Sequence, residues 1–196
     1  MNTISQELKQ FDLQIVKKIS KGYSSDIFLL KNKKGKKFAL KLERIKSTRK
    51  NMVFKESSSL EVANNIGIAP KLFAFDEKNK FLIMEFIEGK RFCDWVLEKK
   101  LNKKVMKKFL INLFVQAKKL DKIGLDHGQL GGKAKNILVR KNLPVIIDFE
   151  KSSQVRRVHN AAQLKSLIFF NKEGFVALRI KEIVGESAIK KIISKY

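Results

Sequence analysis

The amino-acid sequence predicts an α+β fold of two lobes, a small sheet-rich front lobe and a helical back lobe. Five strand-like segments and one helix-like segment precede Gly89, whereas the later segments are helical apart from one short hairpin. The 196 residues suffice for one domain, and their 44% hydrophobic content excludes general disorder. We therefore expect a single domain over 1–196, with a front lobe of about 1–86, a boundary at 85–89 and a back lobe of about 90–196.

Apolar or alternating segments of the front lobe predict the strands of a sheet. They are Phe11–Ile19, Asp26–Leu30, Phe38–Leu42, Leu72–Asp76 and Lys80–Phe86. Small polar residues at Ser20–Ser25 and Lys33–Gly35 predict the turns between the first three strands. A helix over about Asn51–Ile66 follows the third strand, and Gly67 ends it.

The third strand and this helix each place one charged side chain on an inward face. Strand alternation puts Ala39 and Lys41 on one face of the strand. The opposite face carries Phe38, Leu40 and Leu42. Helical spacing puts Glu56 in an apolar stripe that also contains Met52, Leu60 and Ala63. Because burial of an unpaired carboxylate costs free energy, we expect Glu56 to have a cationic partner.

The back lobe is predicted to consist of helices around one small hairpin. The sequence indicates, in order, a short helix at Arg91–Lys100, a longer helix at Lys103–Lys122, a polar loop over 124–135, strands at Asn136–Val139 and Val145–Ile147, and two or three helices from about Val158. The longer helix has a wide apolar face, formed by Val105, Met106, Phe109, Leu110, Leu113, Phe114, Ala117 and Leu120. This face predicts the core of the back lobe.

Positive charge is the most pronounced feature of the composition. The 43 Lys and Arg residues exceed the 19 Asp and Glu residues, which gives a net charge of +24. Such a field attracts polyanions, so RNA or an acidic protein is a candidate partner of the basic surface. The alternative is that the lysines only keep the protein soluble.

Several kinds of protein are disfavoured by the sequence. The segment Met1–Gln10 is polar and lacks the apolar core of a signal peptide. The longest charge-free stretches, Val62–Pro70 and Phe109–Ala117, are much shorter than the about 20 apolar residues of a membrane-spanning helix. The single Cys93 excludes an internal disulfide and a cysteine-built zinc site. We therefore expect a cytoplasmic protein without a membrane segment.

The order of several short motifs is more specific than any one of them. A turn of small residues precedes a strand with Ala-x-Lys, and a helix with an inward Glu follows. A His-Gly-Gln run and Asn136 then precede an apolar strand that ends in Asp-Phe-Glu at 148–150. This order resembles the protein kinase-like fold, most closely its small archaeal members, the RIO kinases and the small kinase subunit of the KEOPS tRNA-modification complex. The resemblance covers about 13–170 and implies a bilobal fold, with a β-rich N-lobe and a reduced helical C-lobe, that binds ATP and Mg²⁺.

The resemblance implies a phosphate-binding part of the ATP site in the front lobe. The Gly-rich loop of the family matches a segment that keeps only its middle glycine, with the ATP-binding positions Ser20, Gly22, Ser25 and Ile27. Lys41 matches the strand lysine that contacts the α- and β-phosphates, and Glu56 matches the helix glutamate that pairs with it. The alternative interpretation of Lys41 and Glu56 is a structural ion pair.

The resemblance also implies an adenine pocket at the boundary between the lobes. Ala39 and Ile27 would form the roof over the adenine ring, and Met84 would border the pocket. The backbone of Glu85 and Ile87 would bind the adenine edge, as the hinge of the family does. The alternative is that this segment is an ordinary apolar strand followed by a turn.

The metal and acceptor positions show two matching residues and three departures. Asp148 and Asn136 match the two residues that hold Mg²⁺ in the family. Gln129 stands where the small archaeal relatives carry the catalytic Asp, and Asn136 comes seven positions later instead of five. An amide cannot accept a proton as a base, but it can orient a hydroxyl group. Glu150 replaces the glycine of the Asp-Phe-Gly motif and adds negative charge near the metal.

Neighbours of this motif have two interpretations each. Lys133 and Lys135 would add donors near the γ-phosphate, or they form a solvated basic loop. His127 matches a structural position that packs beside the motif aromatic, here Phe149, and a role as catalytic base is the alternative. The sequence has no Ala-Pro-Glu motif, so the usual platform for extended peptide substrates is missing.

Three functional hypotheses follow from these residues. The first is a serine/threonine protein kinase that uses MgATP, with Lys41, Gln129 and Asp148 as catalytic residues, restricted activity and an unknown protein substrate. The second is a nucleotide-binding pseudokinase or scaffold, which Gln129 favours. The third is a factor associated with tRNA or rRNA, which the net charge favours and which is compatible with either of the others.

Overall fold

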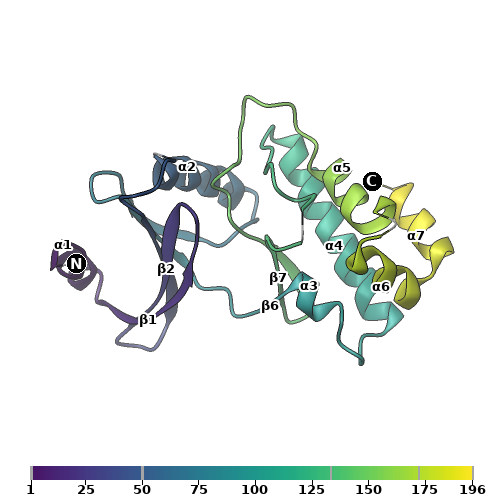
Figure 1. Ribbon diagram of the computed structural model, residues 1–196, viewed down its shortest axis with the longest axis horizontal. Helices are drawn as coiled ribbons and strands as arrows, with labels where there is room; N and C mark the ends of the chain where they lie inside the picture. Colours follow the sequence, from purple (N-terminus) through teal and green to yellow (C-terminus); the bar gives the residue numbers. More distant parts are fainter. Residues whose placement is uncertain (1, 50, 133, 172, 196) are drawn as a thin grey trace.

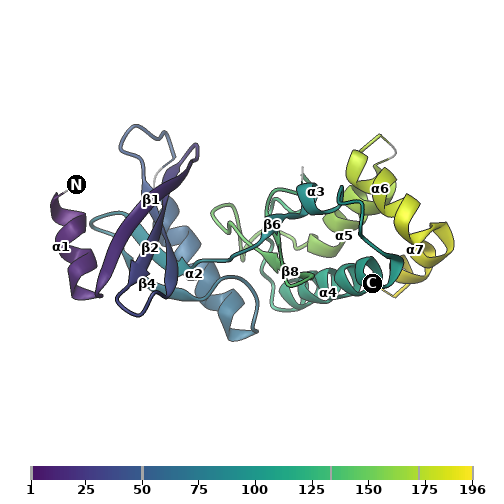
Figure 2. The same ribbon diagram turned by 90° about the horizontal axis from the view of Figure 1, so that it is seen from below.

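The structure, a computed structural model, describes residues 2–49, 51–132, 134–171 and 173–195. Its α+β, bilobal fold confirms the predicted fold class. Figure 1 shows a five-stranded sheet with helix α2 at one end of the molecule and a group of helices at the other. A three-stranded sheet lies between these two parts, as the view from below in Figure 2 also shows.

The N-lobe is built on an antiparallel sheet. Its elements are α1 (Asn2–Gln10), β1 (Leu13–Lys21), β2 (Ser25–Asn32), β3 (Lys37–Glu43), α2 (Met52–Asn65), β4 (Leu72–Asp76) and β5 (Phe81–Glu85). The strand order is β1-β2-β3-β5-β4, and each neighbouring pair is antiparallel. Strand β3 is therefore central, with a hydrogen-bonded neighbour at each edge, and five of its seven residues are buried.

The two faces of β3 belong to different parts of the core, which confirms the predicted alternation. Ala39 packs in the large core that extends into the C-lobe. The other face belongs to a smaller cluster of Leu8, Leu13, Leu30, Phe38, Leu40, Phe81 and Ile83, with Leu42 partly buried against it. Leu8 comes from α1, a helix that the sequence did not indicate because its apolar signal is limited to Ile4 and Leu8.

The segment 20–25, for which a phosphate-binding turn is predicted, is more regular than expected. β1 continues through Lys21 and β2 begins at Ser25, so the predicted turn at Ser20–Ser25 is reduced to residues 22–24. The Gly22 N–H donates to the Ser25 carbonyl at 2.8 Å. A Cβ atom at Gly22 would lie 2.9 Å from that oxygen, so the close approach requires glycine. Strand pairing therefore overrides the turn propensity of Ser20 and Lys21.

Helix α2 is attached to the end of β3 by a carboxylate cap. The side chain of Asn51, the residue before the helix, makes no capping hydrogen bond. Glu43 at the end of β3 instead accepts from the Met52 N–H at 3.1 Å, which satisfies a free donor of the first turn. Glu56 is buried on the inward face of α2, as predicted. Met52 was also expected on this face, but Val53 is buried in its place. Met52 is the first helical residue and remains half-buried beside the cap.

The C-lobe consists of helices around a small sheet. Its elements are β6 (Lys90–Arg91), α3 (Phe92–Trp95), α4 (Lys103–Lys122), β7 (Ile137–Arg140), β8 (Leu143–Ile146), α5 (Asn160–Lys165), the π-helix η1 (Ser166–Phe170), α6 (Phe175–Val184) and α7 (Glu186–Ile193). Of the eight residues predicted for the inward face of α4, seven are buried and Val105 is half-buried. Helix α4 packs against β8, α5 and α6, so it is the centre of the lobe.

The predicted helix at Arg91–Lys100 is wrong for most of its length. Only Phe92–Trp95 is helical, and Arg91 belongs to strand β6. β6 pairs with β7, with Arg91 opposite Leu138. This partner is far away in the sequence, and local helical periodicity cannot reveal it.

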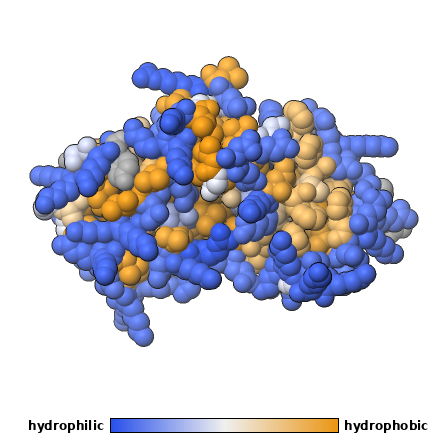
Figure 3. Space-filling model, turned by 180° about the vertical axis from the view of Figure 1, so that it is seen from behind, coloured by the Kyte–Doolittle hydropathy of each residue, from blue (hydrophilic) through white to orange (hydrophobic). Residues whose placement is uncertain are grey.

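The molecular surface is mainly hydrophilic. Figure 3 shows hydrophilic side chains over most of one face, with apolar patches between them. Exposed apolar side chains on the N-lobe sheet include Ile15, Val16, Phe73 and Phe75. Within the described part of the chain, no helix is long and apolar enough to cross a membrane.

Candidate active site

A buried ion triad joins the two lobes. The Lys41 Nζ atom donates to Glu56 Oε1 at 2.6 Å, to Glu56 Oε2 at 2.7 Å and to Asp148 Oδ1 at 2.7 Å. The side chains of Lys41 and Glu56 are 6% and 3% exposed, whereas that of Asp148 is 33% exposed. Asp148 is therefore the member of the triad that a ligand from solvent can reach.

Each member of the triad is positioned by its own element. Lys41 lies in the central strand β3, and Glu56 is presented by α2, whose start is capped by Glu43 from the end of the same strand. Asp148 follows β8 and has a φ of 68°, in the left-handed region that a non-glycine residue adopts at a cost. The ion pair with Lys41 is one contact that holds this backbone conformation in place.

The electrostatics of the triad keep Lys41 charged. Burial by itself would lower the pKa of Lys41, but the adjacent carboxylates of Glu56 and Asp148 raise it above its usual value. Burial by itself would raise the pKa of Asp148, but the Lys41 ammonium holds it below its usual range. Burial raises the pKa of Glu56, which Lys41 offsets only in part. One ammonium thus faces two carboxylates, and the exposed edge of Asp148 keeps a negative charge for a cation.

The predicted phosphate-loop residues lie in a row across the sheet. Ser20 in β1 pairs with Ile27 in β2, and Ile27 pairs with Lys41 in β3. Ser25 is buried at the end of the loop, and Gly22 receives an additional hydrogen bond at its carbonyl from Arg44 Nη1 at 3.2 Å. The structure therefore places Ile27 directly beside the triad lysine, Ser20 one strand farther away, and Gly22 and Ser25 at the turn between β1 and β2.

The predicted adenine-pocket residues lie on the inner face of the sheet and after it. Ala39 in β3 pairs directly with Met84 in β5, and both are buried in the large core. The Glu85 N–H donates to the Lys71 carbonyl at 2.8 Å, and its carboxylate binds Arg140. Ile87 is 6% exposed. Their roles towards adenine stay predictions.

The two predicted metal-binding residues flank the open end of the β7–β8 hairpin, Asn136 before β7 and Asp148 after β8. The Asn136 carbonyl accepts from the Ile147 N–H at 2.9 Å, directly before Asp148. Asn136 also lines an open hollow of about 540 Å³ together with Gln129, Lys135 and Lys151. Gln129 and Asn136 therefore share one depression. Asp148 is not among the residues that line it, and no described hydrogen bond joins Gln129 to the triad. Lys133 lies outside the described residues.

Side-chain amides of α5 hold the loop that contains Gln129, and sequence reasoning did not find them. Gln163 Oε1 accepts from the N–H groups of Leu130 at 2.8 Å and Gly131 at 3.0 Å. Asn160 Oδ1 accepts from the His127 N–H at 2.8 Å. The spacing of Asn160 and Gln163, three residues apart at the start of an apolar helix, could have indicated a shared polar contact.

His127 has the packing position that the sequence predicted for it. Its ring contacts Phe149 edge to face at 4.7 Å between centroids, and Nε2 donates to the Ile147 carbonyl at 3.0 Å. His127 is fully buried, and Nδ1 has no hydrogen-bond partner among the described residues. Burial lowers the pKa of His127 because it disfavours the charged ring. The neighbouring Asp126 is also buried and binds Arg156 Nε at 2.5 Å.

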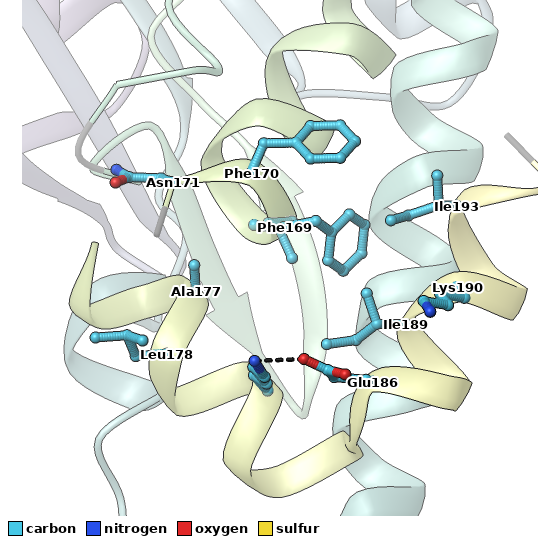
Figure 4. A pocket seen from close by; sticks show the side chains of 11 residues that line it. Phe169, Phe170, Asn171, Ala177, Leu178, Glu186, Ile189, Lys190 and Ile193 are labelled. Carbon is cyan, nitrogen blue, oxygen red and sulfur yellow. Dashed lines mark ion pairs between the residues drawn. The ribbon is translucent and has the colours of Figure 1, made fainter. Parts of the chain in front are cut away.

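A second hollow of comparable size lies away from these groups. It has a volume of about 570 Å³ and is formed by η1, α6 and α7. Figure 4 shows apolar side chains around it, among them Phe169, Leu178 and Ile189, and an ion pair between Lys181 and Glu186. Because the lining of this hollow is mostly apolar, we place the candidate active site at the triad instead.

Comparisons with known proteins concern the family of the chain. A family model described as "RIO domain" matches residues 9–168 of the chain. A curated relative, described as "KEOPS complex subunit Bud32" from Pyrococcus abyssi (strain GE5 / Orsay), is 32% identical over 102 residues. This match covers 52% of the present chain and 44% of the relative, so the chain spans less than half of the relative's length.

The burial of His127 predicts a pH dependence of stability. The folded protein keeps this ring neutral, whereas the unfolded chain binds a proton below about pH 6.5, so acidification favours unfolding. We expect His127→Gln to reduce the loss of unfolding free energy between pH 7.5 and 5.5, by up to about 1.4 kcal/mol per pH unit. Urea denaturation at several pH values measures this for the wild type and the variant. Equal slopes for wild type and His127→Gln would contradict the assignment.

Proposed function

The chain belongs to the RIO domain family, which is an atypical protein kinase-like family, and from this premise we propose that it binds MgATP between its lobes and transfers the terminal phosphoryl group to a serine or threonine hydroxyl. The observation that carries the proposal is the Lys41–Glu56–Asp148 triad. It combines a fixed cation for phosphates with a partly exposed carboxylate for a metal ion, and phosphoryl transfer depends mainly on such positioning and charge neutralisation.

The metal ion that suits these residues is Mg²⁺. Asp148 and Asn136 offer a carboxylate and an amide oxygen, which are hard ligands, and Mg²⁺ usually takes few protein ligands and shares the nucleotide phosphates. Among the described residues no group of three or more His, Cys, Asp or Glu side chains forms a site for a metal held by protein alone. When bound, the metal would neutralise charge on the phosphates, and Lys41 would hold the α- and β-phosphates in place.

The adenine end of ATP would lie at the connection between the lobes. We propose that 85–89 forms a hinge, with the backbone of Glu85 and Ile87 facing the adenine edge. Ala39 and Ile27 would cover the ring, and Met84 would border it. The pairing of Ala39 with Met84, and of Ile27 with Lys41, supports a continuous surface from adenine to phosphates.

The acceptor hydroxyl would be oriented by Gln129. Its position in the hollow with Asn136 supports this role, and its amide replaces a general base whose help is typically worth 10²–10⁴ in rate. Asp126 is a poor substitute, because it is buried and bound to Arg156. We therefore propose slow phosphoryl transfer to a protein acceptor. A nucleotide-binding pseudokinase or scaffold is the alternative, favoured by the same amide.

A second proposal concerns the partners of the chain. We propose that it joins an assembly like that named for its KEOPS relative, and that its basic surface meets RNA or an acidic protein in the cytoplasm. The net charge of +24 is the observation that favours a polyanion. Because the chain matches only part of the relative, this assembly is a proposal for experiment.

Asp148→Asn tests the nucleotide site. The substitution preserves the shape of the side chain but removes its charge, so the metal loses its carboxylate ligand. We expect MgATP binding to be lost in isothermal titration calorimetry, while adenosine binds as it does to the wild type. Folding should persist, because Lys41 keeps Glu56 as its partner. Equal MgATP affinity in both proteins would remove the metal assignment.

Gln129→Asp separates the enzyme from the scaffold. A carboxylate at this position restores a proton acceptor, so we expect phosphoryl transfer to rise by about 10²–10⁴. Autophosphorylation with labelled ATP measures the rate, with Lys41→Ala as the inactive background. Activity in the wild type that Lys41→Ala abolishes supports the kinase. An inactive wild type with an active Gln129→Asp protein supports the scaffold, and inactivity of both contradicts phosphoryl transfer at this site.

Salt dependence tests the polyanion partner. If lysines and arginines contact RNA phosphates, each contact releases counterions and affinity falls steeply with salt. We expect the affinity for fluorescein-labelled tRNA to fall by at least tenfold between 50 and 200 mM KCl, the effect of about two phosphate contacts. Fluorescence anisotropy measures this, with polyglutamate as a competing acidic ligand. A flat response to salt would contradict an RNA interface, and stronger competition by polyglutamate would favour the protein partner.

A further inference from the structure

An ion pair between the lobes lies beside the phosphate loop. Glu150, two residues after Asp148, accepts from Arg49 Nη1 at 3.0 Å. The same Glu150 oxygen, Oε1, is 3.4 Å from the hydroxyl of Ser24, a residue of the 22–24 turn. The side chain of Glu150 is 13% exposed and that of Arg49 is 37% exposed. One carboxylate of the C-lobe is therefore bound both to the phosphate loop and to the loop before α2.

Contacts on the N-lobe hold the Arg49 guanidinium beside Glu150. Its guanidinium lies 4.8 Å from the centre of the Tyr23 ring, a cation–π distance. The Tyr23 hydroxyl is 3.1 Å from that of Thr48, and the Arg49 N–H donates to Ser47 Oγ at 3.1 Å. The guanidinium therefore lies over the ring of Tyr23 in the 22–24 turn, and its Nη1 donates to Glu150.

A nucleotide phosphate cannot lie here without disturbing this pair. Phosphates held between the 22–24 turn and a metal on Asp148 would pass Ser24 and Glu150. Glu150 also lies close enough to the triad for its charge to help raise the pKa of Glu56. A phosphate beside Glu150 would be repelled by its carboxylate. The planar guanidinium of Arg49, in contrast, can bind the oxygens of a phosphate as well as those of a carboxylate.

We propose that Arg49 is a phosphate ligand of the bound nucleotide, and that Glu150 occupies the guanidinium until the nucleotide replaces it. The stacking on Tyr23 keeps Arg49 in place while its anionic partner is exchanged. Glu150 therefore acts as an internal competitor that lowers the affinity for phosphates and selects ligands with enough negative charge to displace it. The inference rests on the proposed nucleotide site and adds one ligand and one regulator to it.

Calorimetric titration with MgATP and with adenosine tests the proposal. We expect Arg49→Ala to weaken MgATP binding by about tenfold, the usual effect of losing a charge-assisted hydrogen bond, with adenosine unaffected. Glu150→Gln should tighten MgATP binding several-fold, again without an effect on adenosine. Lys46→Ala is the matched control, because this exposed lysine in the same loop carries the same charge.

The double variant separates exchange of a partner from general electrostatics. If Glu150 acts through Arg49, most of the gain from Glu150→Gln disappears in an Arg49→Ala background. Equal effects of Arg49→Ala and Lys46→Ala, or equal losses for MgATP and adenosine, would overturn the inference while leaving the nucleotide site intact. Failure of both the wild type and Glu150→Gln to bind MgATP would overturn the inference and the proposed function together.

Discussion

The buried ammonium of Lys41 is the constraint on which the rest of the site depends. A charge removed from water is unfavourable by several kcal/mol unless partners compensate it. Two carboxylates do so here, that of Glu56 from α2 and that of Asp148, two residues after the end of β8. The central strand, the helix and the C-lobe hairpin therefore meet at one point. Because Asp148 is the exposed partner, the same contact that joins the lobes also leaves one anionic edge open to solvent.

Around this point, amides occupy positions where acids would add charge. Gln163 and Asn160 hold the backbone of the loop over 127–131 with neutral side-chain oxygens, and Gln129 lies in that loop. The carboxylates are instead concentrated at Asp148, the proposed metal ligand, and at Glu150, which pairs with Arg49. In the proposed function, this distribution would favour binding and orientation of phosphates over removal of a proton, which is the physical reason that we propose slow transfer.

The scarce carboxylates of this basic chain have structural partners. Of 19 acidic residues, Glu43, Glu56 and Asp126 are buried. Glu43 caps α2, Glu56 neutralises Lys41, and Asp126 binds Arg156. Each of these contacts removes an acidic group from the surface, so the excess of lysine and arginine there is larger than composition alone suggests. The burial of these acidic residues makes the surface more positive, whereas the partly exposed Asp148 keeps a negative charge at the triad.

The sequence by itself determined the features that depend on local periodicity. Alternation placed Lys41 inward and helical spacing placed Glu56 inward, and the cost of a buried carboxylate required a cation beside it. The order of motifs then indicated the family. Only the tertiary structure decided the contacts between distant segments: β6 in place of a predicted helix, Glu43 as the cap of α2, the amides under the Gln129 loop, and Arg49 opposite Glu150. Such pairs are fixed by how whole elements pack, and no periodicity within either segment records its partner.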